Sequence, residues 1–377
     1  MNAQKIREIA NKHISLLDDK KPQTSYKIKY VSTYVKEWLY VMANRPKTPM
    51  INFIDCMCNA GIYKDGDPGT SIKVLELFRD TAFGHQDRQF NIFLNDIDNN
   101  RLDVIKEVSN EILKTKPQNL TLHVANNDVN AYIENVGVFS TQCKPFGAAT
   151  ILFVDPYNFG SVKLRSLKTF IQEYYCELIF NVFTSDFVRN IQNDKNNKKI
   201  VESIGRDITN IKTVEQLVSL IKNELVIGDI KHAFAYEFRT QTNTELYQII
   251  FFTPSIRGLE KLKEALWETF KGREFHRNEK QCETEQLSIW QETDEEQMVL
   301  DVCSRIAKEK VVKHFANIEV AYDEVKIFVL ENTMLFEGQI LNHVLKPLIK
   351  EKKVVKRNKE GKLNYKGDSF VIMGGVP

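Results

Sequence analysis

The chain has 377 residues, of which 42% are hydrophobic and 27% charged, and this composition is typical of a globular protein with room for two or three domains. No apolar run approaches the roughly 18 residues needed to span a bilayer, and the N-terminus has no signal-peptide core, so we expect a cytoplasmic protein without membrane contact. None of the six cysteines forms a CxxC pair, which argues against a disulfide framework. Cys56 and Cys58 have no nearby histidine, so we expect no metal site.

The net charge of +2 hides an asymmetry between the two ends of the chain. Residues 345–377 contain eight lysines, one arginine and three acids, so this segment carries +6 and the rest about −4. A basic segment on an acidic body is expected where one end meets a polyanion, although a solvated lysine-rich surface explains the charge equally well. On the first reading, phosphates would contact Lys353, Lys356 and Arg357.

The N-terminal half alternates helices with strands. Two helices are predicted over 4–20 and 26–44, the second with aromatic residues at a helical spacing. Alternating strands and helices predict βαβ units and therefore a parallel sheet. The predicted strands cover 50–55, 90–95, 120–125, 149–154 and 177–183. One predicted helix begins at Thr70 or Ser71, either of which can cap it, and two further helices cover 98–113 and 162–174.

The C-terminal half predicts a hairpin and then a second domain. A polar segment over 192–230, with a surface insertion at 193–199, precedes strands 232–240 and 245–253 and a helix over 255–270. Three helices (295–316, 320–331 and 336–350) and two strands (352–358 and 362–373) then predict a winged helix-turn-helix. We therefore divide the chain into an N-terminal helical segment (1–48), an α/β domain (49–272), a linker (273–300) and a winged-helix domain (301–377).

The segment from Asn52 to Gly61 is the most informative motif. An apolar run ends in Asp55, and the following loop contains the small residues Asn59, Ala60 and Gly61. A buried strand, an acid and a tight loop are how open α/β sheets hold nucleotide-like ligands. Without further glycines the loop does not suit a dinucleotide pyrophosphate, but it suits a nucleoside without phosphate, such as S-adenosylmethionine.

Four acids, Asp55, Asp96, Asp128 and Asp155, follow four successive predicted strands. The carboxyl ends of parallel strands share one edge, so these acids are expected to converge on one crevice. S-adenosylmethionine would use them: Asp96 for the ribose hydroxyls, Asp128 for the adenine amine, and the backbone of 59–61 for the methionine moiety. For any single acid, a helix cap is the alternative.

The fourth strand is followed by Asp155-Pro156-Tyr157, which partly matches the (Asn/Asp)-Pro-Pro-aromatic motif of amino-methyltransferases that act on nucleic acids. In that motif a side-chain oxygen and a carbonyl accept hydrogen bonds from the target amine. The aromatic residue stacks on the extruded base, which is worth roughly 1–3 kcal/mol. Here the second proline is absent and the aromatic residue comes one position early. Asp155 could instead contact the donor or simply end the strand.

Together these motifs resemble the three-Cys-motif partner family of methyltransferase-like proteins over about residues 20–270. The chain departs from that pattern at Cys56-Met57-Cys58-Asn59 and after Pro156. The matching motifs are Thr24-Ser-Tyr-Lys27, Tyr34-Val-Lys-Glu-Trp38, Phe53-Ile-Asp55, Gly61-Ile-Tyr63, Gly69-Thr-Ser71, Asn95-Asp96, Phe153-Val-Asp155-Pro156, Asn181 with Arg189, and Arg257-Gly258-Leu259.

The resemblance implies a class I methyltransferase (Rossmann-like) fold with a seven-stranded sheet, S-adenosylmethionine as cofactor, and a companion protein similar to radical S-adenosylmethionine enzymes. It also implies that Lys27, Asn181 and Arg189 line the substrate side. The first functional hypothesis is a methyltransferase acting on a base amine of DNA or RNA. The alternatives are a catalytically silent binding subunit, in which Met57 would fill the donor pocket, and a winged-helix adaptor of other proteins.

Overall fold

The computed structural model describes residues 3–190, 194–240, 242–277, 289–357 and 369–373. Internal contacts group the chain into two compact units, 1–255 and 256–377. The finer division into four segments stays a prediction, and much of its proposed linker lies outside the described residues.

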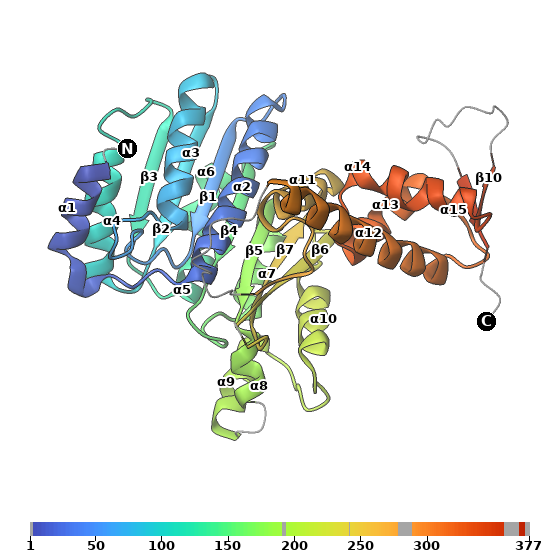
Figure 1. The fold of residues 1–377 in the computed structure, drawn as a ribbon. Coiled ribbons are helices and arrows are strands. Elements are labelled where there is room, and N and C mark those ends of the chain that lie inside the picture. Colours follow the sequence, from blue (N-terminus) through green and yellow to red (C-terminus); the bar gives the residue numbers. More distant parts are fainter. Residues whose placement is uncertain (1–2, 191–193, 241, 278–288, 358–368, 374–377) are drawn as a thin grey trace. The chain divides into compact units, whose positions relative to one another are not determined.

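A mostly parallel sheet forms the centre of the first unit, as the alternation of strands and helices predicted (Figure 1). Strands β1 to β5 run parallel, whereas β7 runs antiparallel to both β5 and β6. The spatial order is β3-β2-β1-β4-β5-β7-β6-β8. The bounds are β1 (Met50–Asp55), β2 (Gln89–Asn95), β3 (Leu120–Ala125), β4 (Ala149–Val154), β5 (Cys176–Val182), β6 (His232–Arg239), β7 (Glu245–Thr253) and β8 (Phe275–Arg277).

The expected strand count was wrong, because the sheet has eight strands and not seven. The eighth, β8, has only three residues, comes after residue 255 where the first unit ends, and falls where a linker was predicted. A strand this short shows no alternation of apolar and polar residues, so its sequence carries no periodic signal. The predicted β6–β7 hairpin is confirmed.

Helices cover both faces of the sheet in the first unit (Figure 1). Successive side chains of a strand point to opposite faces, and β1 shows this directly. The ring of Phe53 lies 6.3 Å from that of Phe78 in α3, whereas Ile54 packs in a core with Phe139 of α6 and Phe170 of α7. One face carries α2 (Pro22–Asn44), α3 (Thr70–Gly84) and α4 (Asn99–Ile112); the other carries α5 (Val129–Glu134), α6 (Val136–Cys143) and α7 (Leu164–Glu173).

The remaining helices of the first unit differ from the predicted bounds. The first helix, α1 (Ala3–Lys12), is shorter than expected and is followed by a 3-10 turn, η1 (Ile14–Leu16). Pro22 starts α2 because its fixed φ suits a first helical turn. The expected surface insertion is largely helical, and the segment between β5 and β6 forms α8 (Thr184–Asn190), α9 (Asp194–Ile204) and α10 (Val214–Leu225).

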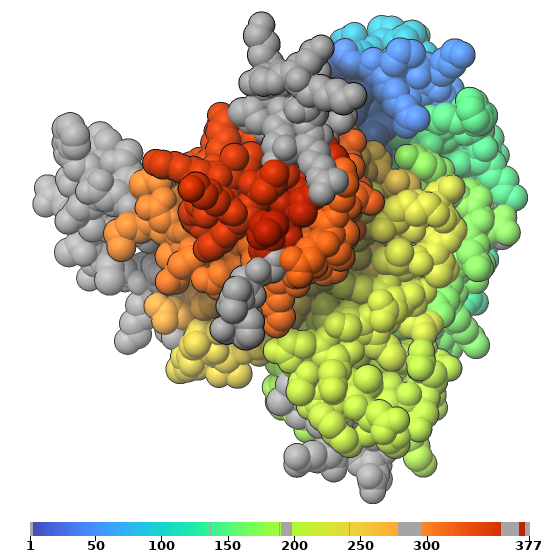
Figure 2. Space-filling view, turned by 90° about the vertical axis from the view of Figure 1, so that its right-hand side faces the viewer, coloured from blue at the N-terminus to red at the C-terminus, as the bar shows by residue number. Residues whose placement is uncertain are grey.

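The second unit combines helices with a small antiparallel sheet of order β10-β11-β9. In the space-filling view of Figure 2, its described residues from about 290 on are orange to red. The predicted helices are present, although a winged helix-turn-helix stays a prediction and residues 362–368 of its last strand lie outside the described residues. The elements are α11 (Ile256–Phe270), α12 (Ile289–His314), β9 (Glu319–Ala321), α13 (Tyr322–Asn332), α14 (Glu337–Ile340), the π-helical turn η2 (Leu341–Leu345), α15 (Lys346–Lys350), β10 (Val354–Arg357) and β11 (Ser369–Ile372).

Among the described helices, none is both long and apolar enough to cross a membrane.

Candidate functional site

A cavity of about 560 Å³ lies at the carboxyl ends of β1 and β4. The strand order reverses between these two strands, so the loops that follow them diverge and leave a crevice, which is where open α/β sheets bind ligands. Its walls come from the N-terminal segment 18–27, the β1–α3 loop, the β4–α7 loop, and side chains that include Phe183 and Tyr247.

Asp55 ends β1 and lines the cavity while remaining buried. Its carboxylate accepts hydrogen bonds from the Ser71 hydroxyl at 2.6 Å and from the Met57 amide at 3.2 Å. Burial raises the pKa of Asp55 to about 7 although both hydrogen bonds lower it. The expected cap of α3 was wrong: Gly69 occupies the N-cap position, so the Ser71 hydroxyl is available to Asp55.

The β1–α3 loop turns sharply over the end of β2. The amide of Cys58 donates to the Asn95 carbonyl at 2.8 Å, and the next amide, that of Asn59, donates to the Asp96 carboxylate at 2.9 Å. Asn59 adopts φ +54°, and Gly61 adopts φ +74° where a Cβ would lie 2.7 Å from Ile105. Close packing therefore explains the glycine without a ligand.

Asn59 and Gly61 line the cavity, whereas Ala60 is buried and lies outside its lining.

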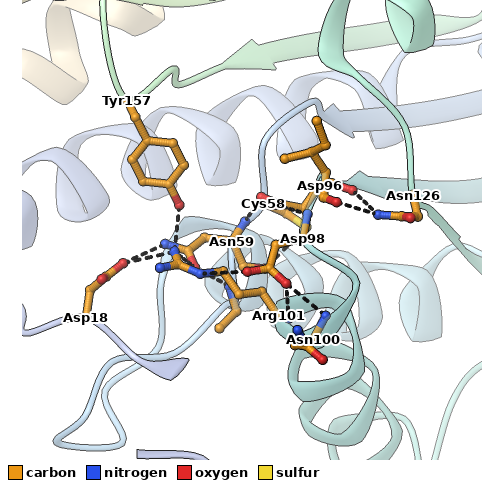
Figure 3. Close-up of polar contacts among 11 residues, drawn as sticks. Asp18, Cys58, Asn59, Asp96, Asp98, Asn100, Arg101, Asn126 and Tyr157 are labelled. Carbon is orange, nitrogen blue, oxygen red and sulfur yellow. Dashed lines mark hydrogen bonds and ion pairs between the residues drawn. The ribbon is translucent and has the colours of Figure 1, made fainter. Parts of the chain in front are cut away.

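The other two predicted donor acids lie outside the cavity lining. Asp96 is buried, and its carboxylate accepts from the amides of Asn59 and Asp98, both at 2.9 Å (Figure 3). Asp128 is exposed and caps α5, accepting from the amides of Asn130 at 2.9 Å and Ala131 at 3.1 Å. The chain enters α5 directly after β3, so this acid satisfies free helical amides. The ribose and adenine assignments stay predictions.

Asp155, after β4, lies in the cavity with both carboxylate oxygens engaged. One accepts from Lys27 Nζ of α2 at 2.5 Å, and the other from Asn181 Nδ2 of β5 at 2.6 Å. The ring of Tyr247 in β7 lies 5.7 Å from Lys27 Nζ, and burial raises the pKa of the Tyr247 hydroxyl. Within the described part of the chain, the Tyr247 hydroxyl and Asn181 Oδ1 are buried without a hydrogen-bond partner. These two polar atoms, next to Asp155 and Lys27, are therefore unused.

Pro156 and Tyr157 also line the cavity, and the Tyr157 side chain is half exposed. Its hydroxyl accepts from Arg101 Nη1 of α4 at 2.9 Å (Figure 3). The same nitrogen contacts Asn59 Oδ1 at 2.6 Å and Asp18 Oδ2 at 3.1 Å.

Sequence reasoning missed Arg101, Asp18 and Tyr247. Asp18 lies in an ordinary charge run, Arg101 on a helix surface and Tyr247 in an apolar strand. No local pattern distinguishes them.

The other predicted substrate residues lie elsewhere. Arg189 is exposed on α8 and forms an ion pair with Asp186 at 2.5 Å, outside the cavity lining. In the second unit, Lys353 pairs with Glu351 at 3.1 Å, and Lys356 and Arg357 lie on β10. A groove of about 530 Å³ along α12 is lined by charged side chains, namely Arg305, Lys308, Lys313, Lys353, Glu309 and Glu351.

Cys56 and Cys58 are buried free thiols whose pKa values are raised by burial. A neutral thiol is neither a nucleophile nor a metal ligand. Within the described residues, no group of three or more His, Cys, Asp or Glu side chains is arranged to hold a metal ion.

No protein-family model matches the sequence, and no curated protein matches it. Among solved structures, one match is a Listeria monocytogenes protein described as a candidate class I S-adenosylmethionine-dependent methyltransferase, with 10% identity, a TM-score of 0.31, and coverage of 67% of this chain and 69% of that chain. Another is loganic acid methyltransferase with S-adenosylhomocysteine, with 12% identity, a TM-score of 0.28, and coverage of 66% and 84%. A third is an O-methyltransferase family protein from Burkholderia thailandensis, with 9% identity, a TM-score of 0.26, and coverage of 58% and 55%.

These scores carry no inference about ligand or substrate. The class of fold rests on the sheet itself, in which five parallel strands are followed by a hairpin whose last strand, β7, runs antiparallel between β5 and β6. This is the α/β arrangement of class I methyltransferases.

Proposed function

We propose that the protein is an S-adenosylmethionine-dependent methyltransferase that modifies a base amine of DNA or RNA. The observation that carries the proposal is the cavity between β1 and β4, which has a carboxylate from each strand end, Asp55 and Asp155, and an aromatic rim residue, Tyr157. Its volume of about 560 Å³ is within the range of roughly 300–1,000 Å³ found for small-molecule sites.

The donor side is the part of the cavity formed by Asp55 and the β1–α3 loop. When bound, S-adenosylmethionine supplies an electrophilic methyl group on a sulfonium cation. The Asp55 carboxylate, held by Ser71 and the Met57 amide, offers a partner for positive charge. The left-handed turn at Asn59 shapes the loop, of which Asn59 and Gly61 line the cavity on this side.

The acceptor side is organised around Asp155. Lys27 and Asn181 fix its carboxylate in one orientation at the end of β4. In that orientation the carboxylate would accept a hydrogen bond from the incoming amine, and Tyr157 would stack on the base. Aligning the amine with the methyl group at about 3 Å accounts for most of the rate gain in such a transfer.

The second unit supplies a surface for the nucleic acid backbone. The α12 groove contains four basic side chains against two acids, and β10 carries Lys356 and Arg357. Lysines and arginines that neutralise phosphates provide affinity independent of sequence. The C-terminal segment 345–377, with nine basic residues against three acids, suits a polyanionic polymer.

A second candidate is a catalytically silent methyltransferase-like subunit. Both oxygens of Asp155 are already engaged, and the Asp96 carboxylate is engaged by the Asn59 amide. A protein of this kind would bind a partner similar to radical S-adenosylmethionine enzymes, as the resemblance to the three-Cys-motif partner family suggests.

The test combines calorimetry with S-adenosylmethionine and transfer of labelled methyl groups to DNA and RNA pools. We expect binding and transfer by the natural protein, and binding without transfer by Asp155→Ala. Glu173→Gln, which changes an exposed carboxylate on α7, is the control and should keep both binding and transfer. Binding without transfer to any nucleic acid would favour the silent subunit. Undetectable binding at millimolar ligand by a folded protein would overturn the proposed cofactor.

A further inference from the structure

An arginine outside the cavity lining connects four segments around the donor side. We propose that Arg101 is a positioning residue for donor binding: it fixes the β1–α3 loop against Asp96 and holds Tyr157 at the cavity rim. This inference rests on the proposed function, because the donor is the ligand whose affinity Arg101 would set. Arg101 itself acts through its neighbours.

Four separate segments meet at the Arg101 guanidinium (Figure 3). Nη1 contacts Asn59 of the β1–α3 loop at 2.6 Å, Tyr157 of the β4–α7 loop at 2.9 Å, and Asp18 of the N-terminal segment at 3.1 Å. Nε lies 3.7 Å from Asp98, the residue that caps α4. Hydrogen bonds from a charged donor are among the strong ones, and Nη1 makes all three of these contacts.

The contact with Asn59 controls the backbone of the loop. Asn59 adopts φ +54°, a left-handed conformation that asparagine takes more readily than most residues with a side chain. Its Oδ1 accepts from Arg101 and from the Ala60 amide, both at 2.6 Å, while its Nδ2 donates to Asp18 at 3.0 Å. With the side chain fixed in this way, the Asn59 amide points at Asp96. Arg101 therefore supports the turn that joins the first two strand ends.

Charge balance adds a second reason for a cation at this place. Asp18 and Asp98 contact the guanidinium, and Asp96 lies near enough to affect it. Burial lowers the pKa of Arg101, but Tyr157, Asp18 and Asp96 raise it by more, so the net shift is upward. Without the guanidinium, three carboxylates would share one region with no compensating charge, and repulsion would push the loop and the N-terminal segment apart.

Removing Arg101 should therefore affect the donor side first. The β1–α3 loop would sample other conformations, and Tyr157 would lose the contact that holds it at the rim. Asp155 would keep Lys27 and Asn181, so this part of the acceptor side would stay ordered. We expect weaker donor binding with nearly unchanged turnover at saturating donor.

The experiment compares Arg101→Gln, Arg101→Lys and Tyr157→Phe with the full-length natural protein. Lys106→Gln is the matched control, since Lys106 lies on the same helix and pairs with exposed Asp103 at 3.0 Å. Two readouts are needed: amide hydrogen exchange of residues 56–63 without ligand, and calorimetric affinity together with KM and kcat for S-adenosylmethionine.

For Arg101→Gln we expect faster exchange in residues 56–63 and about tenfold weaker donor affinity, with kcat at saturating donor unchanged within about twofold. Arg101→Lys should recover part of the affinity, and Lys106→Gln should match the natural protein. Tyr157→Phe removes a single hydroxyl, so it gives a smaller loss of affinity even if Arg101→Gln fails to fold.

Natural exchange rates in Arg101→Gln would overturn the inference, as would unchanged donor affinity in both Arg101→Gln and Tyr157→Phe. If the natural protein binds no S-adenosylmethionine, the proposed function fails instead. The exchange measurement then still decides whether Arg101 positions the loop.

Discussion

The buried carboxyl of Asp55 should make the first unit less stable as the pH rises. Its pKa is about 7 in the folded protein against 3.8 for an exposed aspartate, mainly because of burial. Between these values the unfolded chain has released the proton that the native protein still holds. The unfolded state therefore binds fewer protons, so the free energy of unfolding falls with increasing pH.

The shift from 3.8 to about 7 sets the size of the effect. At about 1.4 kcal/mol per pKa unit, ionising Asp55 in place costs roughly 4 kcal/mol relative to an exposed aspartate. Part of this loss in unfolding free energy has already occurred at about pH 5. Between about pH 5 and pH 8 we therefore expect Asp55 to lower the free energy of unfolding by about 3 kcal/mol.

The substitution that isolates this effect is Asp55→Asn, which cannot ionise and still offers an oxygen to Ser71. Unfolding of the ligand-free protein would be followed by urea or heat at about pH 5, 6.5 and 8. The stability of Asp55→Asn relative to the natural protein should rise by about 3 kcal/mol across this range, or roughly 6–12 °C in Tm for a unit of this size. The pKa of Glu177 is also raised to about 7, but this group is present in both proteins and cancels.

Asp87→Asn, at a carboxylate that is 73% exposed, serves as the control and should show no such trend. If the curves of Asp55→Asn and the natural protein stay parallel from pH 5 to pH 8, the reasoning about burial of Asp55 is refuted.

Three further predictions follow from the same contacts. Asp96→Ala should weaken S-adenosylmethionine binding by about tenfold or more, since it removes the proposed ribose acceptor and the partner of the Asn59 amide; unchanged calorimetric affinity would refute the ribose assignment. Glu177→Gln keeps an acceptor for Tyr34, and its free energy of unfolding should rise by about 2 kcal/mol relative to that of the natural protein between about pH 5 and pH 7.5, as measured by urea unfolding. A difference in unfolding free energy that stays constant with pH would contradict the raised pKa of Glu177. Affinity for nucleic acid should fall linearly with the logarithm of salt concentration, and a flat response would favour a protein adaptor.

The sequence predicted the central strands well because buried parallel strands are short, continuous apolar runs. The range 50–55 matches β1, and 149–154 matches β4. The order of helices and strands then placed the crevice, since a parallel sheet brings its strand ends to one edge. Three-residue β8 has too few residues to show a pattern.

Side-chain roles were harder to predict than strands. Being near a strand end does not decide whether an acid meets a ligand, a loop amide or a helix cap. Asp55 lines the cavity, Asp96 holds the Asn59 amide and Asp128 caps α5. These outcomes depend on how far each loop continues before the next helix begins. The contact between Lys27 and Asp155 joins residues 128 positions apart, and no local pattern encodes it.

The N-terminal segment turns out to belong to the site. Asp18 contacts Arg101 and Asn59 on the donor side, and Lys27 contacts Asp155 on the acceptor side. Asp19 adds an ion pair with Lys64 of the β1–α3 loop at 2.8 Å. The chain between Asp18 and Lys27 therefore ties the loop after β1 to the acid after β4. A change that loosens this segment should disturb both halves of the cavity together, whereas loss of Arg101 should disturb the donor half and Tyr157 but leave the contacts of Asp155 in place.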